Sequence, residues 1–375
     1  MKKTFLGGLS PQQFLRRHWQ KQPLLIKNAF PGFKDLLTRE QLFELACRDD
    51  VQARQVMQKR NTWEVFHGPF AAKDFRKLPK CNWTLLVQGV NHFLPQAQRL
   101  LLQFNFIPYA RLDDLMVSYA PPGGGVGPHF DSYDVFLLQG GGRRLWQISA
   151  QKDLQLIENA PLKILKKFNA EQEWLVEAGD MLYLPPQYAH NGAALDDCMT
   201  YSIGFRAPSA QELAVQFLLY LQDHLHFDGM YCDPGLRPQL RPAQISEAML
   251  RKAAYLLKQI KWSGREVELF FGQYLTEPKP HVIFEPPKRP LAFGDFVRHI
   301  TSRGAHLDLK SRMLVHRNRV FMNGETYEFK GNGFRSLAAL ADARELATRA
   351  VLDGKVRNLL YQWYAAGYIK IGCTP

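Results

Sequence analysis

Three residues near the middle of the chain have the types and the spacing of a metal site. His129 and Asp131 stand two positions apart, after a turn-forming run rich in glycine and proline at 121–128 and before an apolar run. Residues i and i+2 of a strand point to the same face, so the imidazole and the carboxylate would project together. His190, which follows a turn and a short apolar segment at 179–186 and is expected in a loop, would be the third ligand. Two histidines and one carboxylate on one side of a metal favour ferrous iron and oxygen chemistry.

The spacing His-x-Asp occurs three times in the chain, and its setting separates the three occurrences. The pair that begins at His226 follows a stretch with helical periodicity, and positions i and i+2 of a helix do not share a face. The pair that begins at His306 lies in a predicted loop without a partner histidine downstream. Only the pair at His129 has the glycine-rich approach, the following strand and the distant histidine, so we expect the metal there.

Arg143 and Arg144 are candidates for binding an anion beside this metal. If the runs 135–138 and 143–148 form a hairpin around a turn at 139–142, Arg144 returns alongside the metal pair. A guanidinium that faces an enclosed interior needs an anion, and a dicarboxylic acid that chelates the iron would provide one. Adjacent strand residues face opposite sides, so at most one of the two arginines is inside, and the sequence does not determine the register. The alternative is that both are solvated hairpin charges that pair with nearby acidic residues.

The segments that must position these residues have the pattern of a barrel with helices in front of it. Alternation of apolar and polar residues predicts strands at 112–119 and 200–205, on either side of the metal residues. Several strands with glycine and proline turns and few helices predict a double-stranded β-helix core. Apolar residues at helical spacing predict helices at 39–46, 83–93 and 97–103.

Residues 116–206 resemble the JmjC-type, cupin-fold 2-oxoglutarate oxygenases. Four strings are similar to the bacterial ribosomal-oxygenase branch of that family: Pro-Gly-Gly-Gly-Val-Gly-Pro-His129, Ser-Tyr-Asp134-Val-Phe, Gly-Arg-Arg-Leu-Trp146 and Tyr201-Ser-Ile-Gly-Phe-Arg-Ala-Pro208. Arg17-His-Trp-Gln-Lys-Gln-Pro-Leu-Leu-Ile26 and Phe66-His-Gly-Pro-Phe70 resemble the same branch, and the C-terminal region resembles its winged-helix tail. The resemblance therefore covers essentially the whole chain.

The resemblance implies a 2-oxoglutarate-dependent dioxygenase that uses Fe(II) and O2 to hydroxylate C3 of an arginine side chain in a large-subunit ribosomal protein. It implies that the iron ligands, which are also the catalytic residues, are His129, Asp131 and His190. It also implies that the residues around 2-oxoglutarate are Arg144, Met116 and Thr200. Thr200 departs from the pattern of bacterial relatives, which carry asparagine there, and a threonine hydroxyl has a shorter reach.

The expected substrate contacts are Tyr133 and Asp134, because aspartates and aromatic rings can hold a guanidinium. Asp113 and Asp114 could add to an acidic cleft for a basic substrate. The net charge of +13 is spread over the chain rather than gathered in a lysine- and arginine-rich block, so it does not indicate a nucleic-acid tail. We expect a ribosomal protein as the partner and no direct binding of nucleic acid.

Length and composition predict a globular protein of two or three domains, because 375 residues exceed what one core usually supports. Hydrophobic residues make up 46% of the chain, which excludes disorder, and no apolar run approaches the ~18 residues of a membrane span. The five cysteines are scattered, odd in number and never in a Cys-x-x-Cys pair, as is typical of a reducing cytosol. The expectation is a cytoplasmic protein that does not associate with membranes.

The expected fold class is α+β, with a double-stranded β-helix (JmjC/cupin) core, N-terminal helices, a helical region that the family uses to form a homodimer, and a C-terminal winged-helix domain. The expected divisions are the oxygenase domain at 1–208, the dimerisation region at 209–277, a proline-rich linker at 278–290 and the winged-helix-like domain at 291–375. Ser209, a candidate helix N-cap, supports the first boundary. Asn323-Gly324 predicts a hairpin between strands at 313–321 and 325–329.

Two other functions remain open from the sequence. A transcription regulator could sense a small molecule in its cupin domain and bind DNA through its winged helix, and a basic row on the last helices would favour it. The helix predicted at 337–348 has few outward cations, which favours a protein contact instead. The second alternative is a histidine hydroxylase of another ribosomal protein, which would use the same metal residues with a different pocket.

Overall fold

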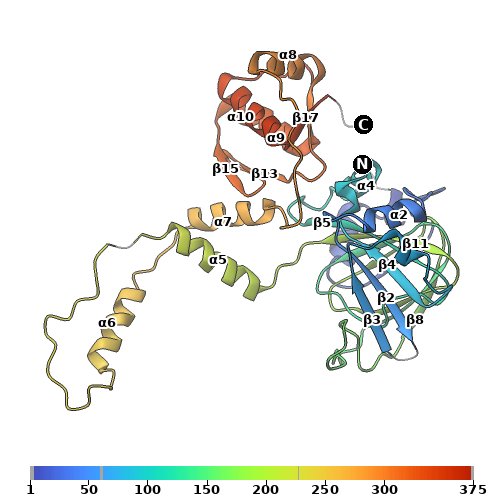
Figure 1. Cartoon of the computed structure of the whole chain (residues 1–375), viewed down its shortest axis with the longest axis horizontal. Helices are drawn as coiled ribbons and strands as arrows, with labels where there is room; N and C mark the ends of the chain where they lie inside the picture. The colour runs from blue at the N-terminus through green and yellow to red at the C-terminus, as the bar shows by residue number, and fades with distance from the viewer. Residues whose placement is uncertain (1–3, 60–61, 227, 373–375) are drawn as a thin grey trace.

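The computed structural model describes residues 4–59, 62–226 and 228–372 of the chain. Figure 1 shows a β-rich N-terminal half, an extended arm that carries the helices α5 Ala210–His224 and α6 Glu247–Leu257, and a compact C-terminal domain that lies over α7. The N-terminal helical elements are η1 Thr4–Leu6, α1 Pro11–Arg17, α2 Arg39–Ala46, α3 Ala72–Phe75, η2 Val90–His92 and α4 Pro95–Leu102. Ser10 and Thr38 begin α1 and α2 with capping boxes, in which the hydroxyl accepts from the third helical amide.

Eleven strands of the described N-terminal half form two sheets. Their bounds are β1 Leu24–Ile26, β2 Ala53–Lys59, β3 Thr62–His67, β4 Trp83–Val87, β5 Leu112–Ala120, β6 Val135–Gln139, β7 Arg144–Ser149, β8 Gln172–Val176, β9 Met181–Leu184, β10 Ala189–Ala194 and β11 Cys198–Phe205. The larger sheet has the order β1-β9-β6-β11-β5-β4-β2-β3, and the smaller has the order β10-β7-β8. This arrangement is the double-stranded β-helix, and the predicted α+β fold class with its N-terminal helices is confirmed.

The N-terminal helices cover the outer face of the larger sheet and form the main core with it. Phe14 of α1 is fully buried and packs edge-on against Tyr183 of β9 and close to Phe136 of β6. Aromatic rings dominate this core, since each buries a large apolar area and prefers edge-to-face contacts. The rigid layer behind the sheet holds the strands that carry the metal residues on their opposite face.

Two predictions of local structure are wrong. The segment 83–93 is not a helix: β4 has all five residues buried, and a left-handed Gly89 ends it before η2. A strand buried on both faces has a continuous apolar run, which periodicity does not distinguish from a buried helix. The segment 313–321 is two strands, because Arg317 adopts a left-handed conformation and reverses the chain between them.

The predicted hairpin between 135–138 and 143–148 is also wrong. β6 pairs with β9 and β11 in the larger sheet, whereas β7 pairs with β8 and β10 in the smaller one. The turn between them carries the chain from one sheet to the other, with Gly142 in the left-handed region where its neighbours leave no room for a side chain. The two strands therefore face each other across the barrel interior instead of sharing an edge.

The C-terminal half begins with three helices, α5 Ala210–His224, α6 Glu247–Leu257 and α7 Gly264–Thr276. It continues through α8 Phe293–Arg303, β12 Ala305–Leu307, β13 Met313–His316, β14 Arg319–Met322, β15 Glu325–Glu328, α9 Gly331–Ala343, β16 Glu345–Leu346, α10 Gly354–Ala365 and β17 Ile369–Ile371. A second hydrophobic core, separate from that of the cupin half, joins α8, α9 and α10 to these strands. The predicted winged-helix domain is confirmed.

The described cysteines Cys47, Cys81, Cys198 and Cys232 are free thiols, and Cys373 lies outside the described residues. Among the described residues, every helix is too short or too polar to cross a bilayer.

Candidate metal centre and active-site cavity

The two histidines of the predicted metal site meet through backbone pairing. His129 and His190 form an isolated antiparallel bridge, in which each backbone N–H donates to the other residue's carbonyl oxygen at 2.9 and 2.8 Å. His190 lies on β10 rather than in the expected loop, and the Gln187 amide donates to the Asp131 carbonyl at 2.7 Å. One ligand atom from each of His129, Asp131 and His190 lies within 4.8 Å of the others. Sequence positions 61 residues apart thus converge on one point.

Backbone carbonyls orient both imidazole rings. Nδ1 of His129 lies 2.9 Å from the Gly127 carbonyl oxygen, and Nδ1 of His190 lies 2.9 Å from that of Tyr188. A carbonyl oxygen only accepts, so each Nδ1 carries the proton and donates it. The lone pair of each Nε2 is left to face Asp131, whose Oδ2 is 3.7 Å from Nε2 of His190. This tautomer and orientation are those of metal-binding histidines.

Burial keeps His190 neutral. The pKa of its imidazole is lowered to about 4, first by desolvation and then by the neighbouring His129, while the charge of Asp131 opposes both effects. A neutral imidazole is the form that donates a lone pair to a metal. His190 therefore offers a neutral nitrogen to a metal at neutral pH.

The metal residues open onto a cavity of about 700 Å³ between the two sheets. Met116, Tyr133, Thr200 and Arg144 line it, together with the three metal residues. On β11, Thr200 pairs with Ser118 of β5 on one side and with Gln139 of β6 on the other. Gly204 lies four residues further, about 14 Å along a strand. The cavity is thus long enough to have two distinct ends.

Arg144 marks one end of the cavity. Its side chain is buried, whereas Arg143 is half exposed and forms an ion pair with Asp196 at 2.8 Å. Nη1 of Arg144 donates to the Gly192 carbonyl at 3.1 Å, but Nε has no hydrogen-bond partner among the described residues. Nor does any described carboxylate lie within ion-pair distance of this guanidinium. The structure therefore selects Arg144, rather than Arg143, as the arginine that faces the interior.

Gln139 and Thr200 lie at the same end. The Thr200 hydroxyl donates to Oε1 of Gln139 at 3.1 Å, and Nε2 of Gln139 donates to the Gly141 carbonyl at 3.0 Å. Both side chains are buried. The threonine hydroxyl is therefore used within the wall, where it orients the glutamine.

The opposite end of the cavity carries a buried carboxylate. Asp114 of β5 lines it and accepts from the Gly89 amide at 3.0 Å, and Gly204 of β11 lies against it. Tyr133 stands between the two ends: burial raises the pKa of its phenol, and the nearby charges of Asp131 and Asp114 raise it further. The cavity thus has the buried Arg144 guanidinium at one end, the buried Asp114 carboxylate at the other, and the metal residues between them.

Two domain families match the chain. The JmjC domain family matches residues 99–213, and the ROXA-like winged helix matches residues 259–370. A ribosomal protein uL16 3-hydroxylase of Escherichia coli is 37% identical over 280 residues, which cover 74% of this chain and 74% of the relative. The chain belongs to the JmjC-type ribosomal oxygenases.

Solved structures share the whole architecture of this ribosomal oxygenase. The X-ray structure of Escherichia coli YcfD, at 32% identity, aligns with a TM-score of 0.84 over 96% of this chain and 98% of that one. YcfD in complex with cobalt and 2-oxoglutarate aligns with a TM-score of 0.82 at the same coverage. A probable ribosomal oxygenase of Haemophilus influenzae is 42% identical over 210 residues, 55% of this chain and 52% of the relative.

The residues of this ribosomal oxygenase fit the Fe(II) and 2-oxoglutarate that JmjC enzymes use. Two imidazoles and one carboxylate on one side of a metal form the facial set of non-haem iron oxygenases, and they leave the other positions open. The unpartnered Nε of the buried Arg144 provides a donor for a carboxylate, and a buried guanidinium without an anion is otherwise costly. At the Arg144 end of the cavity, the Trp146 ring packs directly on Gly192, where a Cβ would lie 2.6 Å from the ring.

Asp134 is placed differently from the sequence-based expectation. Its carboxylate is fully buried behind the sheet, where it accepts from the Tyr183 hydroxyl at 2.6 Å, from Gln20 at 3.0 Å and from Arg111 at 3.4 Å. It is absent from the cavity wall, because neighbouring residues of an extended chain point to opposite sides and Tyr133 takes the inner one. The expected substrate contact at Asp134 is therefore corrected: the carboxylate at this end is Asp114.

Sequence reasoning missed two residues that line the site. Arg54 reaches the cavity from β2, and Lys279 reaches it from the segment after α7. Neither lies near the metal motif in the sequence. Only the pairing of β2 with β4 and the return of the chain after α7 bring them to the cavity.

Proposed function

We propose that this ribosomal oxygenase hydroxylates C3 of an arginine side chain in a large-subunit ribosomal protein of the uL16 type, with Fe(II), O2 and 2-oxoglutarate. One observation carries the proposal: a single cavity has a buried guanidinium with an unpartnered Nε at one end, a buried carboxylate at the other and a facial metal set between them. Its similarity to the uL16 3-hydroxylase of Escherichia coli supports the same substrate class.

The residues of the chain divide the work between binding and positioning. His129, Asp131 and His190 would hold the iron, and Arg144 would bind the distal carboxylate of 2-oxoglutarate, with Met116 and Thr200 in the wall of its pocket. When bound, iron and 2-oxoglutarate supply the oxidising chemistry: the keto acid is decarboxylated to succinate and one atom of O2 enters a C–H bond. The protein excludes water and holds the substrate carbon beside the metal.

The far end of the cavity is suited to a cationic side chain. Asp114 can accept two hydrogen bonds from a planar guanidinium, a geometry that a histidine ring does not match. Tyr133 stands on the path from Asp131 to Asp114, where its ring can cover the aliphatic part of the side chain. The separation between the metal residues and Asp114 suits the long side chain of arginine better than that of histidine, so it favours arginine as the target.

The test is hydroxylation of a synthetic arginine peptide of uL16 by the purified protein with Fe(II) and 2-oxoglutarate. We expect the peptide to gain the mass of one oxygen atom on its arginine, in step with succinate formation. His129→Ala should abolish both products. A counterpart with histidine in place of the arginine should remain unmodified.

Modification of the histidine peptide alone would replace the arginine assignment by a histidine one. If neither peptide is modified, ribosomal proteins from cells with and without the gene, compared by mass spectrometry, decide whether another protein of the large subunit is the substrate. An unchanged ribosome in both strains would refute a ribosomal target.

We further propose that the protein is a homodimer and that the arm is its dimerisation region, with divisions at 208, 277 and 290 as expected. No residue of α6 is buried within one chain. Large apolar side chains of the arm are exposed, namely Leu218, Leu219, Met230, Leu236, Leu240, Ile245, Leu250, Tyr255, Leu257 and Trp262. An exposed apolar surface of this extent is typical of a protein interface. A ribosomal substrate also places the activity in the cytoplasm.

A further inference from the structure

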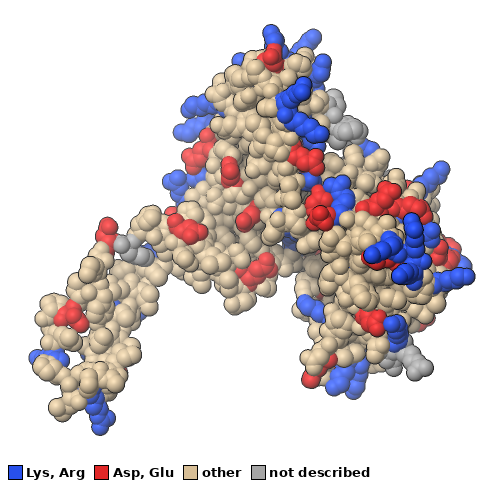
Figure 2. All heavy atoms as spheres, viewed as in Figure 1, with Lys and Arg blue, Asp and Glu red and all other residues tan. Residues whose placement is uncertain are grey.

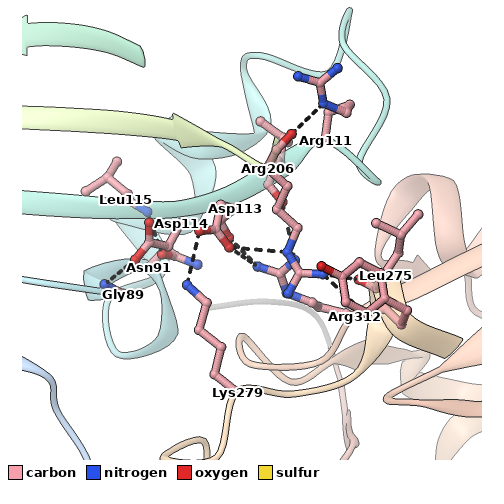
Figure 3. A network of polar contacts seen from close by, with 12 residues as sticks. Gly89, Asn91, Arg111, Asp113, Asp114, Leu115, Arg206, Leu275, Lys279 and Arg312 are labelled. Atoms are coloured by element: carbon pink, nitrogen blue, oxygen red, sulfur yellow. Dashed lines mark hydrogen bonds and ion pairs between the residues drawn. The ribbon is translucent and has the colours of Figure 1, made fainter. Parts of the chain in front are cut away.

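A cluster of charged side chains joins the far end of the cavity to the C-terminal half of the chain (Figure 3). Its centre is Asp113, the second residue of β5. Lys279 Nζ lies 3.1 Å from its carboxylate, Arg312 Nη2 lies 3.2 Å from it and Arg206 Nε lies 3.4 Å from it. Lys279 comes from the segment after α7, Arg312 from the residue before β13 and Arg206 from the end of β11. Four elements thus meet at one carboxylate.

The same arginines hold the backbone of β5 and α7. Arg312 donates to the carbonyl oxygen of Leu112 at 3.3 Å and also to that of Asp113. Arg206 donates to the carbonyl oxygen of Leu275 at 2.9 Å. A guanidinium from the winged-helix domain therefore fixes the start of the strand that carries Asp114.

The charges of the cluster do not balance around Asp113 alone. Three cations surround one carboxylate, and they keep the pKa of Asp113 below its usual value although burial acts to raise it. The next carboxylate is Asp114, which in Figure 3 points away from Asp113. Burial raises the pKa of Asp114, and the adjacent charge of Asp113 raises it further, whereas Lys279 and Arg312 act to lower it. The pKa of Asp114 is raised overall, and the two C-terminal cations limit this rise.

We propose that Arg312 and Lys279 are positioning residues for substrate binding: they fix the start of β5 through Asp113, and their charges act on Asp114, the acceptor for a cationic side chain. The winged-helix domain and the segment before it would then set the affinity for substrate without contact with 2-oxoglutarate. This inference rests on the proposed function, in which Asp114 receives the substrate guanidinium. A winged-helix domain that acts on the cupin cavity also gives this domain a role other than binding nucleic acid.

Other charged groups near this end belong to the balance. Tyr133 faces Asp114 from the opposite wall, and Arg54 of β2 faces Tyr133. His92 of η2 lies near both Arg312 and Lys279; burial first, and then these cations, lower its pKa to about 3, so it is neutral at physiological pH. None of these groups shares the contact with Asp113 that links the two halves of the chain.

The first test needs neither substrate nor metal. Carboxyl 13C NMR of the metal-free full-length protein follows the titration of Asp114, with its resonance assigned by Asp114→Asn. We expect Arg312→Met to move the titration of Asp114 to higher pH, because the variant removes one of the cations that oppose burial and Asp113. The matched control is Arg317→Met, since the Arg317 side chain is 75% exposed and lies beside Glu268.

The second test measures selectivity for charge. An arginine peptide and its neutral citrulline counterpart are compared by binding calorimetry and by steady-state turnover. The wild type should prefer arginine, and each unit of rise in the Asp114 pKa above the ambient pH should lower affinity about tenfold. A carboxyl group binds a cation only when ionised, so Arg312→Met should lose the preference at neutral pH and regain it as the pH rises. KM for the peptide should change, while KM for 2-oxoglutarate should stay within about twofold.

A double variant separates electrostatics from folding. Asp113→Asn removes the like charge beside Asp114, so Asp113→Asn/Arg312→Met should recover most of the peptide affinity that Arg312→Met loses. Lys279→Met should behave as a weaker Arg312→Met. The proposal is overturned if the Asp114 titration does not move in Arg312→Met, or if the double variant is as impaired as the single one.

Failure of the proposed function gives a different pattern. If the wild type binds and hydroxylates no arginine peptide, the target assignment fails, yet the NMR titration still decides whether Arg312 controls Asp114. If the peptide is hydroxylated normally by Arg312→Met with unchanged KM and pH dependence, the function stands and the positioning role is refuted.

Discussion

At the scale of single residues, the chemistry depends on which polar atoms are left without a partner. The Nδ1 atoms of His129 and His190 are engaged by carbonyl oxygens, which leaves both Nε2 atoms for a metal. Arg143 is satisfied by Asp196, and Arg144, one residue later, retains a free Nε inside the cavity. Two neighbouring residues of one type thus have different roles because a strand alternates its faces.

Arg144→Lys is expected to raise KM for 2-oxoglutarate by about 10- to 100-fold, because a lysine loses the bidentate contact of a charged hydrogen-bond pair. Arg143→Lys is the matched control and should change KM by less than about twofold, since exposed ion pairs contribute little. Succinate formation at varied 2-oxoglutarate measures both. Equal effects of the two variants would contradict the assignment of Arg144.

Thr200→Val should mainly affect stability. It removes the hydroxyl that donates to Oε1 of Gln139 and leaves a buried acceptor unpaired, at a cost of about 1–3 kcal/mol. Thr200→Ser keeps the donor and should retain more of the stability. Thermal unfolding compares the three proteins, and KM for 2-oxoglutarate should rise less in Thr200→Val than in Arg144→Lys. A larger rise would show that the hydroxyl contacts the cosubstrate.

At the scale of elements, α7 packs against the winged-helix domain as well as against α5, whose Phe217 contacts Phe270 of α7. Gly272 of α7 lies against Phe321 of β14, and Glu268 of α7 pairs with Arg319 of β14. The match of the ROXA-like winged helix also begins before α7, at residue 259. This packing sets where the chain leaves α7, and therefore where Lys279 reaches the cavity.

Gly272→Val should destabilise this contact by about 1–3 kcal/mol, because a Cβ at this position would lie 2.3 Å from the buried Phe321 ring. Gly264→Ala, at the start of the same helix with open space around it, should change stability by less than about 0.5 kcal/mol. Thermal unfolding measures both variants. A Gly272→Val protein as stable as the wild type would show that α7 can shift away from β14.

At the scale of the whole molecule, α5 of the arm packs against α7 through Phe217 and Phe270, whereas no residue of α6 is buried within its own chain. On the face that Figure 2 shows, most of the surface of the arm is neither acidic nor basic. An 11-residue helix such as α6 is marginal by itself, so its stability depends on packing against another surface. In the proposed dimer, a second copy of the chain would provide that surface.

Light scattering should therefore give a mass of twice the 43.2 kDa of the chain. Leu250→Asp/Leu257→Asp should dissociate the dimer, because both side chains lie on one face of α6 and are exposed in the single chain. Val351→Asp, an exposed apolar position of the winged-helix domain, is the control that should leave the mass unchanged. A monomeric wild type would refute the proposed dimer.

Sequence by itself determined what depends on neighbouring residues. The i, i+2 spacing of His129 and Asp131, the N-caps of α1, α2 and α5, and the turn at Asn323 all follow from local backbone sterics and hydrogen bonding. The metal set and the fold class could be predicted because such local signals, together with the family strings, cover the barrel.

The tertiary structure decided which side of each strand faces the cavity and what reaches it from afar. β6 and β7 lie in different sheets, Asp134 is turned behind the sheet and Asp114 replaces it, and Arg312 comes to Asp113 from 199 residues away. These outcomes depend on which sheet each strand joins and on how two domains pack. Both are set by the burial of apolar surface over the whole chain, which no local pattern encodes.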